Sequence, residues 1–552
     1  MTTPGRQTAM SYEQMLDDLD DELCTWPAEP QVFTRANALD QWPNPITPLT
    51  QELVELPQER GLEGAFVRVL GVTEPSPQWT WNGCFYGYVM FGVTPSAAVA
   101  DNLPGWNRAG VYADYLGVNP DPKAPDESGG SPNILSLLKI GANFAAALRN
   151  YPCQARRDTA MARRQLDDDL TRDWPSQSDE YLLARINTFV GTHARQREPH
   201  AVASVIGAAL FKQFTQTAEK LAGPEDGAGL ATEAITPLGG VHMSEAIEAM
   251  ARVKAGQLDR AEFLRDYGFR GSNEFELESR TWSDDAATVD RLIDGAERPL
   301  ATPAQEGARR ELKQLAGWRW PLLRRQLSFT EHHLRWRENG KVPMAMAVAS
   351  LRVVVREAGL RLAERAIIDD PSDVFYLRKP DLDNALRGQI ESGQLLARIA
   401  RRRETHQLAF QLPLPEIVDA TPHGLVRMSE ARWRSLGVFP PKTPDERSTV
   451  LAGVGGSPGT ATGRARIVHD PNTIDIDDGD ILVARGTDSA WTPLFMQASA
   501  VVVDIGGVMS HACIAAREVG IPCVIDVKHG TTRISEGQRI CVDGAAGSVT
   551  LL

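Results

Sequence analysis

The hydrophobic positions of this chain change their spacing along its length. From about residue 130 to residue 435, apolar side chains recur at the spacing of amphipathic helices, for example in 134–140 and 393–399. Residues 1–120 differ, because they are rich in Pro, Gly and Trp and hold only short apolar runs. We therefore predict a mainly α-helical domain over residues 1–437, whose first 120 residues are irregular and partly strand-containing.

A different pattern begins at residue 450. Short apolar runs rich in β-branched residues alternate there with two helical segments up to residue 552. Between the two patterns, residues 438–449 contain Pro440, Pro441 and Pro444, a composition typical of a semi-rigid tether. The predicted fold class is multidomain: a mainly α-helical domain, a linker at 438–449 and a C-terminal α/β domain at 450–552.

The C-terminal domain contains the most informative local pattern. The apolar run 501–505 predicts a buried strand, and two glycines follow it. Ser510 is a favourable N-cap, so the helical pattern of 511–519 places His511 in the first turn of a helix. Unpaired backbone N–H groups and the positive end of the helix dipole favour a bound anion there. His511 is therefore either the carrier of a phosphoryl group or a histidine that packs or caps the helix.

The composition of the chain limits the kinds of molecule that we expect it to bind. Of the 552 residues, 42% are hydrophobic and 24% charged, and the net charge of −14 argues against general nucleic-acid binding. Because the sequence has neither a run of eighteen apolar residues nor a signal-peptide core, we expect a cytoplasmic protein that does not contact membranes. The six cysteines lack Cys-x-x-Cys spacing, and the adjacent His332 and His333 point to different faces of a helix. We therefore predict no metal site.

The segment from Gly506 to Pro522 resembles the phosphohistidine motif of the phosphoenolpyruvate-utilising enzymes. In that family, a mobile domain swings a phosphorylated histidine between two distant sites. The resemblance covers roughly residues 450–552, and further matching blocks follow in the expected order: 453–459, 463–468, 479–483, 487–488, 491–495 and 542–544. It implies that 450–552 is a swivelling phosphohistidine domain and that His511 is its catalytic phosphoryl carrier.

The resemblance also implies phosphate-binding residues around His511. They are Gly507, Ser510, Thr487, Asp488 and Arg517. Arg517 lies less than two helical turns beyond His511, but a structural pairing with Glu518 or Asp543 is an equal alternative. Cys513 and Cys523 lie near His511 in sequence and are expected to act as small buried side chains.

Blocks before the mobile domain are similar to the acceptor domain of rifampicin phosphotransferases. These blocks are Asn37 with 45–50, 266–274 with Trp282, 337–341 and 373–377. One residue departs from the pattern, because Phe269 stands where those relatives usually have His. That departure puts in doubt any hydrogen-bonding or proton-transfer role of the position.

The parts that the sequence lacks refine the expected function. Residues 1–552 contain neither a barrel that would bind phosphoenolpyruvate or pyruvate nor a Gly-rich phosphate loop before the helical domain, so we do not expect chemistry on pyruvate within this polypeptide. The arrangement resembles that of phenylphosphate synthases, in which the ATP-binding part is a separate polypeptide. We therefore expect ATP and Mg²⁺ to bind to a separate ATP-grasp subunit, and this chain to bind no cofactor tightly.

Candidate acceptor-site residues lie within the resembling blocks. Arg337 and Lys341 are four apart, which puts two cations on one helix face if the segment is helical, whereas Glu338 between them faces elsewhere. Arg270 and Glu274 are likewise four apart and match the family. Aromatic residues of the first 120 positions, above all Trp81, could line an apolar acceptor pocket. The alternatives are a solvated charged face for the ions and core packing for the aromatic residues.

Together these expectations predict a dikinase-type phosphotransferase component. It would carry a phosphoryl group from ATP on His511 to a hydroxyl of an apolar organic acceptor, an alcohol or a phenol. The alternative hypothesis is a non-catalytic phosphocarrier or regulatory protein that is phosphorylated on His511.

Overall fold

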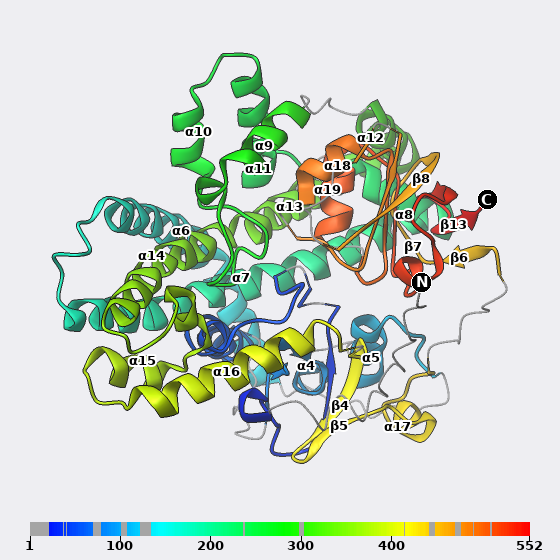
Figure 1. Cartoon of the computed structure of the whole chain (residues 1–552). Helices are drawn as coiled ribbons and strands as arrows, with labels where there is room; N and C mark the ends of the chain where they lie inside the picture. Colours follow the sequence, from blue (N-terminus) through cyan, green and yellow to red (C-terminus); the bar gives the residue numbers. More distant parts are fainter. Residues whose placement is uncertain are drawn as a thin grey trace, which may run out of the picture.

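The computed structural model describes most of the chain: residues 21–36, 38–39, 41–69, 79–100, 107–121, 134–235, 238–296, 303–412, 414–440, 448–469, 476–477, 479–488, 491–507 and 510–552. Two units are visible in Figure 1, a large helical body and a C-terminal α/β domain in orange and red that lies against α9, α11 and α13. The predicted multidomain fold class is confirmed.

Three long helices form the centre of the helical body: α6 (Ile134–Thr171), α7 (Asp179–Ala222) and α14 (Val342–Glu364). α7 begins favourably, because the side chain of its N-cap Ser178 accepts a hydrogen bond from the N–H of Tyr181. Most of α14 is buried, and its apolar residues contribute to the largest core cluster of the described residues. Burial of its surface therefore stabilises α14 on nearly all sides, as expected for a core helix.

Shorter helices surround these three (Figure 1). In chain order they are α2 (Pro48–Thr50), α3 (Leu56–Val69), α4 (Val93–Val99), α5 (Arg108–Leu116), α8 (Pro224–Ile235), α9 (His242–Lys254), α10 (Arg260–Tyr267), α11 (Ala286–Gly295), α12 (Pro303–Ala316), α13 (Trp320–Asn339), α15 (Lys379–Leu386), α16 (Ser392–Ala409) and α17 (Glu430–Ser435). A π-helical turn, Gln51–Glu55, joins α2 to α3. The stretch 48–69 is thus helical rather than irregular, because Pro48 occupies the favourable first position of a helix.

A five-stranded sheet closes the helical body at one end. Its strands are β1 (Gln31–Thr34), β2 (Asn82–Phe85), β3 (Tyr88–Gly92), β4 (Ile417–Thr421) and β5 (Gly424–Val426), in the order β2-β3-β1-β4-β5. β1 pairs antiparallel with β4, with Phe33 opposite Val418. The strands predicted in the first 120 residues are therefore present, but they are completed by residues almost 400 positions later in the chain.

The predicted linker is described only at its two ends. Residues 441–447 lie outside the described residues, as does Asn37 of the first acceptor-domain block. Val438 is buried, and the N–H of Phe439 donates to the carbonyl of Asn119 (3.0 Å). The N–H of Asp121 in turn donates to the carbonyl of Gly437 (2.8 Å). The first residues predicted as linker are thus fixed to the helical body.

The C-terminal domain is built on an eight-stranded sheet, in the order β6-β13-β12-β8-β9-β10-β11-β7. The strands are β6 (Val450–Ala452), β7 (Val454–Ser457), β8 (Thr460–Val468), β9 (Ile481–Ala484), β10 (Ala500–Val503), β11 (Cys523–Ile525), β12 (Arg539–Asp543) and β13 (Ser548–Leu551), with the helices α18 (Thr492–Gln497), α19 (His511–Val519) and α20 (Gly530–Arg533). β8, β9, β10 and β11 run parallel. β10 is fully buried, as its apolar sequence predicts for a central parallel strand.

Two further observations concern the described residues alone. Their helices include none with the length and apolar character that crossing a bilayer requires. Nor do the described His, Cys, Asp and Glu residues form a group of three that could hold a metal ion.

Candidate functional site

His511 is the first residue of α19, where the sequence predicted a helix start. The preceding Ser510 has the extended backbone of an N-cap, but its hydroxyl makes no capping hydrogen bond. Ser510 Oγ and Thr487 Oγ1 are both buried hydroxyl oxygens without a hydrogen-bond partner among the described residues. Burying a hydroxyl without a hydrogen-bond partner costs free energy. A ligand that hydrogen-bonds to these two hydroxyls at the helix end would remove that cost.

A small hollow of about 50 Å³ lies where α19 meets the helical body. Its charged and polar lining consists of His242, Ser244, Arg270, Glu274, Glu338, Lys341, His511 and Glu518, and its apolar lining of Val241, Met243, Ile247, Ile514 and Ala515. The residues come from both domains, since His511 and Glu518 belong to α19. The structure thus brings the predicted carrier together with three predicted acceptor-site residues: Arg270, Glu274 and Lys341.

Arg337 and Lys341 flank Glu338 at the corner between α13 and α14. α13 ends at Asn339 and Lys341 is the N-cap of α14, so the two cations do not share one uninterrupted helix face. Arg337 Nε lies 3.6 Å and Lys341 Nζ 4.0 Å from the Glu338 carboxylate. The carbonyl of Arg337 accepts a hydrogen bond from His200 Nδ1 (3.1 Å), which fixes the end of α13.

The prediction that Glu338 faces elsewhere is wrong. Glu338 lines the hollow, and its buried Oε1 has no hydrogen-bond partner among the described residues. Burial by itself raises the pKa of this carboxyl, but Lys341 and Arg337 outweigh burial and lower it below its ordinary value. The sequence could not predict this position, because α19 and the Arg270 loop, which complete the hollow around Glu338, come from distant segments.

A rigid loop presents Arg270 and Glu274. Arg270 Nη1 donates to both carboxylate oxygens of Glu274 at 2.9 Å, and the two side chains are each only 6% exposed. From α14, the buried Arg352 donates to the carbonyls of Glu274 (3.1 Å) and Glu276 (2.8 Å). The core helix therefore holds the loop through its backbone, and the Arg270–Glu274 pair has a fixed geometry.

The other end of this loop is anchored by a buried hydrogen-bond network. The Glu276 carboxylate accepts from Thr47 Oγ1 (2.8 Å) and Thr50 Oγ1 (2.7 Å). Gly271 is required within the loop, since an added Cβ would lie 2.4 Å from the carbonyl oxygen of Arg280. The sequence block 45–50 is thus bound to the residues that directly follow the block 266–274.

The environment of His511 keeps its imidazole neutral. Burial, followed by the nearby Lys341, lowers the pKa of His511 to about 3, although Glu338 acts in the opposite direction. Arg270 and Arg337 lower it further. A neutral ring has a nitrogen lone pair available as a nucleophile at physiological pH.

His242, which the sequence pattern did not single out, lines the same hollow. His242 is the first residue of α9, as His511 is of α19, so the first turns of two helices meet at this hollow. The local signal is the same in both cases, because a pair of glycines (Gly239-Gly240 and Gly506-Gly507) precedes each histidine by a few residues. Two positive helix ends favour an anion between them.

The remaining predicted phosphate-binding residues take different positions. Gly507 is exposed, and a Cβ added to it would meet no atom within 4 Å, so its backbone is open to a ligand. Asp488 accepts a hydrogen bond from the N–H of Asn273 (2.9 Å), which joins the two domains. Arg517 Nε donates to the carbonyl of Gly456 (2.6 Å) inside the C-terminal domain. Arg517 thus supports the fold around α19, and it forms no ion pair with either carboxylate considered as its alternative partner.

Trp81 does not line the hollow. Its side chain is 1% exposed and stacks on Phe66 with ring centroids 4.4 Å apart, within an apolar core cluster. Phe269, at the position where the relatives usually have His, is also buried and packs 5.7 Å from the His242 ring. The structure therefore assigns Trp81 to the core, which the sequence left open as an alternative.

Glu518 joins the C-terminal and helical domains directly. Its carboxylate accepts hydrogen bonds from the N–H of Leu238 (2.5 Å) and from Ser244 Oγ (3.0 Å). Burial raises the pKa of Glu518, although these two donors act against the rise. Together with the Asp488–Asn273 contact, this bond holds α19 with His511 facing the hollow.

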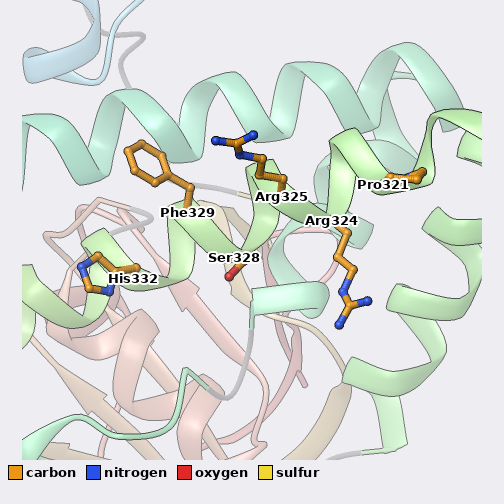
Figure 2. A pocket seen from close by; sticks show the side chains of 6 residues that line it. All are labelled: Pro321, Arg324, Arg325, Ser328, Phe329 and His332. Atoms are coloured by element: carbon orange, nitrogen blue, oxygen red, sulfur yellow. The ribbon is translucent and has the colours of Figure 1, made fainter.

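A larger, open hollow of about 510 Å³ lies elsewhere on α13 (Figure 2). Its lining residues are Pro321, Arg324, Arg325, Ser328, Phe329 and His332. None of the predicted site residues belongs to it, and its lining contains no carboxylate. Its size alone does not make it the reaction site.

Comparison with known families agrees with the geometry around His511. Residues 476–547 match the family model of the PEP-utilising enzyme, mobile domain. The C-terminal domain is such a mobile domain. This match covers β9 to the loop before β13 and includes His511 and the whole of α19.

Similarity to curated proteins extends into the helical body. The rifampicin phosphotransferase of Streptomyces sviceus is 30% identical over 377 residues, which are 64% of this chain and 40% of that protein. That of Bacillus cereus is 26% identical over 380 residues, 65% of this chain and 40% of that protein. An uncharacterised protein of Mycobacterium tuberculosis is 34% identical over 283 residues, 51% of this chain and 30% of that protein. The predicted resemblance to rifampicin phosphotransferases is confirmed, although the chain spans less than half the length of these relatives.

Proposed function

We propose that this chain transfers a phosphoryl group from His511 to a hydroxyl of a small, largely apolar organic acceptor. One observation carries the proposal: the hollow between the domains combines His511 with Arg270, Lys341 and Glu338. The apolar side chains of the same lining would contact the body of the acceptor. The similarity to proteins named rifampicin phosphotransferases supports the reaction class.

The proposed transfer uses the residues in distinct roles. A lone pair of the acceptor hydroxyl forms the new P–O bond, while the N–P bond breaks and leaves its electron pair on the His511 nitrogen. The hydroxyl proton passes to Glu338 and then to the imidazole, so protons and charge balance. Lys341, Arg337 and Arg270 stabilise the negative charge of the phosphoryl group as it moves. A carboxylate of lowered pKa suffices as the base, because a loose phosphoryl transfer demands little proton abstraction before the transition state.

The donor side of the reaction follows from the family resemblance. ATP and Mg²⁺ would bind to a separate ATP-grasp subunit, which phosphorylates His511 when the mobile domain has swung away from the hollow. The purified chain alone is then expected neither to bind ATP tightly nor to consume it. Micromolar binding of ATP by the isolated chain in calorimetry would contradict this part of the proposal.

The decisive experiment follows the phosphate on His511. With an ATP-grasp subunit, labelled ATP and a panel of alcohols and phenols, the chain should gain one acid-labile, alkali-stable phosphate and pass it to an acceptor. His511→Ala should abolish both labelling and product, whereas His332→Gln on the outer side of α13 should change neither. Labelling that survives His511→Ala would overturn the proposal, and labelling without any product would favour the phosphocarrier alternative.

A second pair of variants separates transfer from labelling. Arg337→Ala and Lys341→Ala should leave the labelling of His511 intact but slow single-turnover transfer, because these cations belong to the helical domain. Removal of one such electrostatic contact typically costs about 100- to 1,000-fold in rate. Arg324→Ala, on the exposed side of the same helix α13, is the matched control and should transfer at the parent rate.

A further inference from the structure

The hydrogen bond between His242 and Arg270 defines which ring nitrogen of His242 carries the proton. The proposed transfer described above gives this histidine no role. Arg270 Nη2 lies 3.2 Å from His242 Nδ1. A guanidinium can only donate, so Nδ1 must be the acceptor and carries no proton. Burial, followed by the charge of Arg270 and then of Arg163, lowers the pKa of His242 to about 2. The ring is therefore neutral, and its single proton is on Nε2.

The position of this ring is fixed from several sides. Arg270 cannot rotate freely, because its other nitrogen, Nη1, binds both oxygens of Glu274. The rings of Tyr267 and Phe269 lie 5.0 and 5.7 Å from the His242 ring, centroid to centroid. The backbone N–H of His242 donates to Asn339 Oδ1 (2.9 Å) at the end of α13. The ring is thus clamped between α10, α13 and the Arg270 loop.

The Nε2–H group remains available to a ligand. Within the part of the chain that the structure describes, it has no hydrogen-bond partner, whereas Nδ1 and the backbone N–H are both paired. The same histidine lines the hollow that contains His511. A fixed N–H donor on a residue that lines the same small hollow as His511 is suited to bind an oxygen of the group that His511 would carry.

We propose that His242 donates its Nε2–H to a phosphoryl oxygen during transfer, with Arg270 holding the ring in the required tautomer. This inference rests on the proposed function, because it assumes that His511 delivers a phosphoryl group to the hollow. His242 would then act as a neutral donor that orients the group and stabilises its charge, without giving up its proton. Arg270 gains a second role as a positioning residue.

Two amide substitutions can distinguish the role of Nε2 from that of Nδ1 in the His242 ring. The side-chain amide of Gln can place an N–H donor near the position of Nε2, whereas the oxygen of Asn can accept from Arg270 near the position of Nδ1. We therefore expect His242→Gln to retain much of the transfer rate. His242→Asn and His242→Ala should both lose about 100-fold or more in single-turnover transfer, as for removal of an oxyanion donor. His332→Gln is the control for loss of an exposed histidine.

The measurement begins from protein phosphorylated chemically on His511 with phosphoramidate, so that no partner subunit is needed. Phosphorus NMR then follows loss of the phosphohistidine signal in the presence of the acceptor panel. Equal rates for the parent, Asn and Ala variants, or rescue by Asn rather than Gln, would overturn the role of Nε2–H. The role would also be contradicted if the Asn or Ala variant lowered the apparent affinity for the acceptor without changing the maximal rate. His242 would then contact the acceptor rather than the phosphoryl group.

A second readout tests the tautomer independently of turnover. Nitrogen NMR of histidine-labelled protein should show His242 neutral, with its proton on Nε2, from pH 5 to pH 8. Phosphorylation of His511 should shift the Nε2 signal of His242 while the His332 signal stays in place. Titration of His242 in this range, or a protonated Nδ1, would contradict the proposal. Failure of His511 to accept phosphate at all would instead count against the proposed function.

Discussion

At the scale of single residues, the proposed transfer depends on which carboxylate in the hollow is free to act as the base. Glu338 and Glu274 both line the hollow, but Glu274 is committed to Arg270 by two hydrogen bonds. Glu338 has one buried oxygen without a hydrogen-bond partner among the described residues and lies farther from its cations, at 3.6 and 4.0 Å. This difference makes Glu338 the better candidate for the base.

Glu338→Gln is therefore expected to slow phosphoryl transfer while sparing the labelling of His511. Loss of a general base typically costs about 100- to 10,000-fold. Single-turnover transfer from phosphorylated protein measures the effect. Glu331→Gln serves as the control, since Glu331 lies on the same helix and pairs with Arg309 and Arg335, outside the hollow. Equal rates for both variants would show that the proton leaves by another path.

The position of a residue in the fold could be predicted where neighbouring residues in the sequence determine it. The helix start at His511 follows from its own neighbours, a buried strand, two glycines and a favourable N-cap. The direction of Glu338 was predicted wrongly, and the choice between pocket and core was left open for Trp81. In both cases the surrounding residues come from distant segments of the sequence. Near the end of α13, Glu338 lines the hollow beside α19, whereas α3 covers Trp81 with Phe66. Neither contact leaves a periodic signal in the sequence.

At the scale of elements, the loop 268–277 is the least tolerant part of the site. At Gly271 the loop packs against backbone, since the nearest atom to an added Cβ would be the carbonyl oxygen of Arg280. Asn273 adopts the left-handed conformation (φ 50°) while its N–H contacts Asp488. The loop thus carries Arg270, Glu274 and a docking contact within one short segment.

Gly271→Ala should displace this loop and so impair transfer and stability together. Overpacking of this kind typically costs about 1–3 kcal/mol in the free energy of unfolding. Chemical denaturation and single-turnover transfer provide the two readouts. Gly307→Ala is the opposite control: Gly307 lies within α12 with open space around it, and alanine should stabilise the helix by about 0.5–1 kcal/mol. An unchanged transfer rate in Gly271→Ala would show that the loop can adapt.

Element types were largely predictable, but their assembly was not. Helical spacing indicated the long central helices, and apolar runs indicated the strands of the mobile domain. The pairing of β1 with β4 joins segments that are far apart in the sequence, and no short-range pattern specifies such a contact. The same holds for the hollow, which needs α9, α13, α19 and the Arg270 loop to meet.

At the scale of the whole molecule, docking of the mobile domain should depend on pH. In the docked arrangement the pKa of His511 is lowered to about 3 from an ordinary value of 6.5. Docked protein therefore binds fewer protons at His511, and docking weakens as the pH falls below about 6.5. The raised pKa of Glu518 acts in the opposite direction, because its protonation is favoured on docking. The His511 effect begins at higher pH, so it should dominate between pH 7.5 and 5.5.

Hydrogen exchange can test this balance at two backbone amides. The N–H groups of Leu238 and Asn273 donate to the mobile domain, so their protection reports docking. After correction for the intrinsic exchange rate, protection should fall from pH 7.5 to pH 5.5. His511→Gln should remove most of this dependence, and Glu518→Gln should weaken docking at both pH values. Protection that is constant or rises on acidification of the parent protein would contradict the prediction.

The attachment of Gly437, Val438 and Phe439 to residues 119–121 has a consequence for how far His511 can travel. Eight peptide steps separate Pro440 from Ser448, and at about 3.6 Å per residue they span at most roughly 29 Å. In the swinging motion that the proposed function requires, this short segment would keep the C-terminal domain near residues 119–121, so His511 would reach only a limited volume around that attachment. Within that volume its local concentration is expected to reach the millimolar range typical of short tethers. Under the proposed function, a separate subunit that phosphorylates His511 would have to place its ATP within this volume, close to the attachment at residues 119–121.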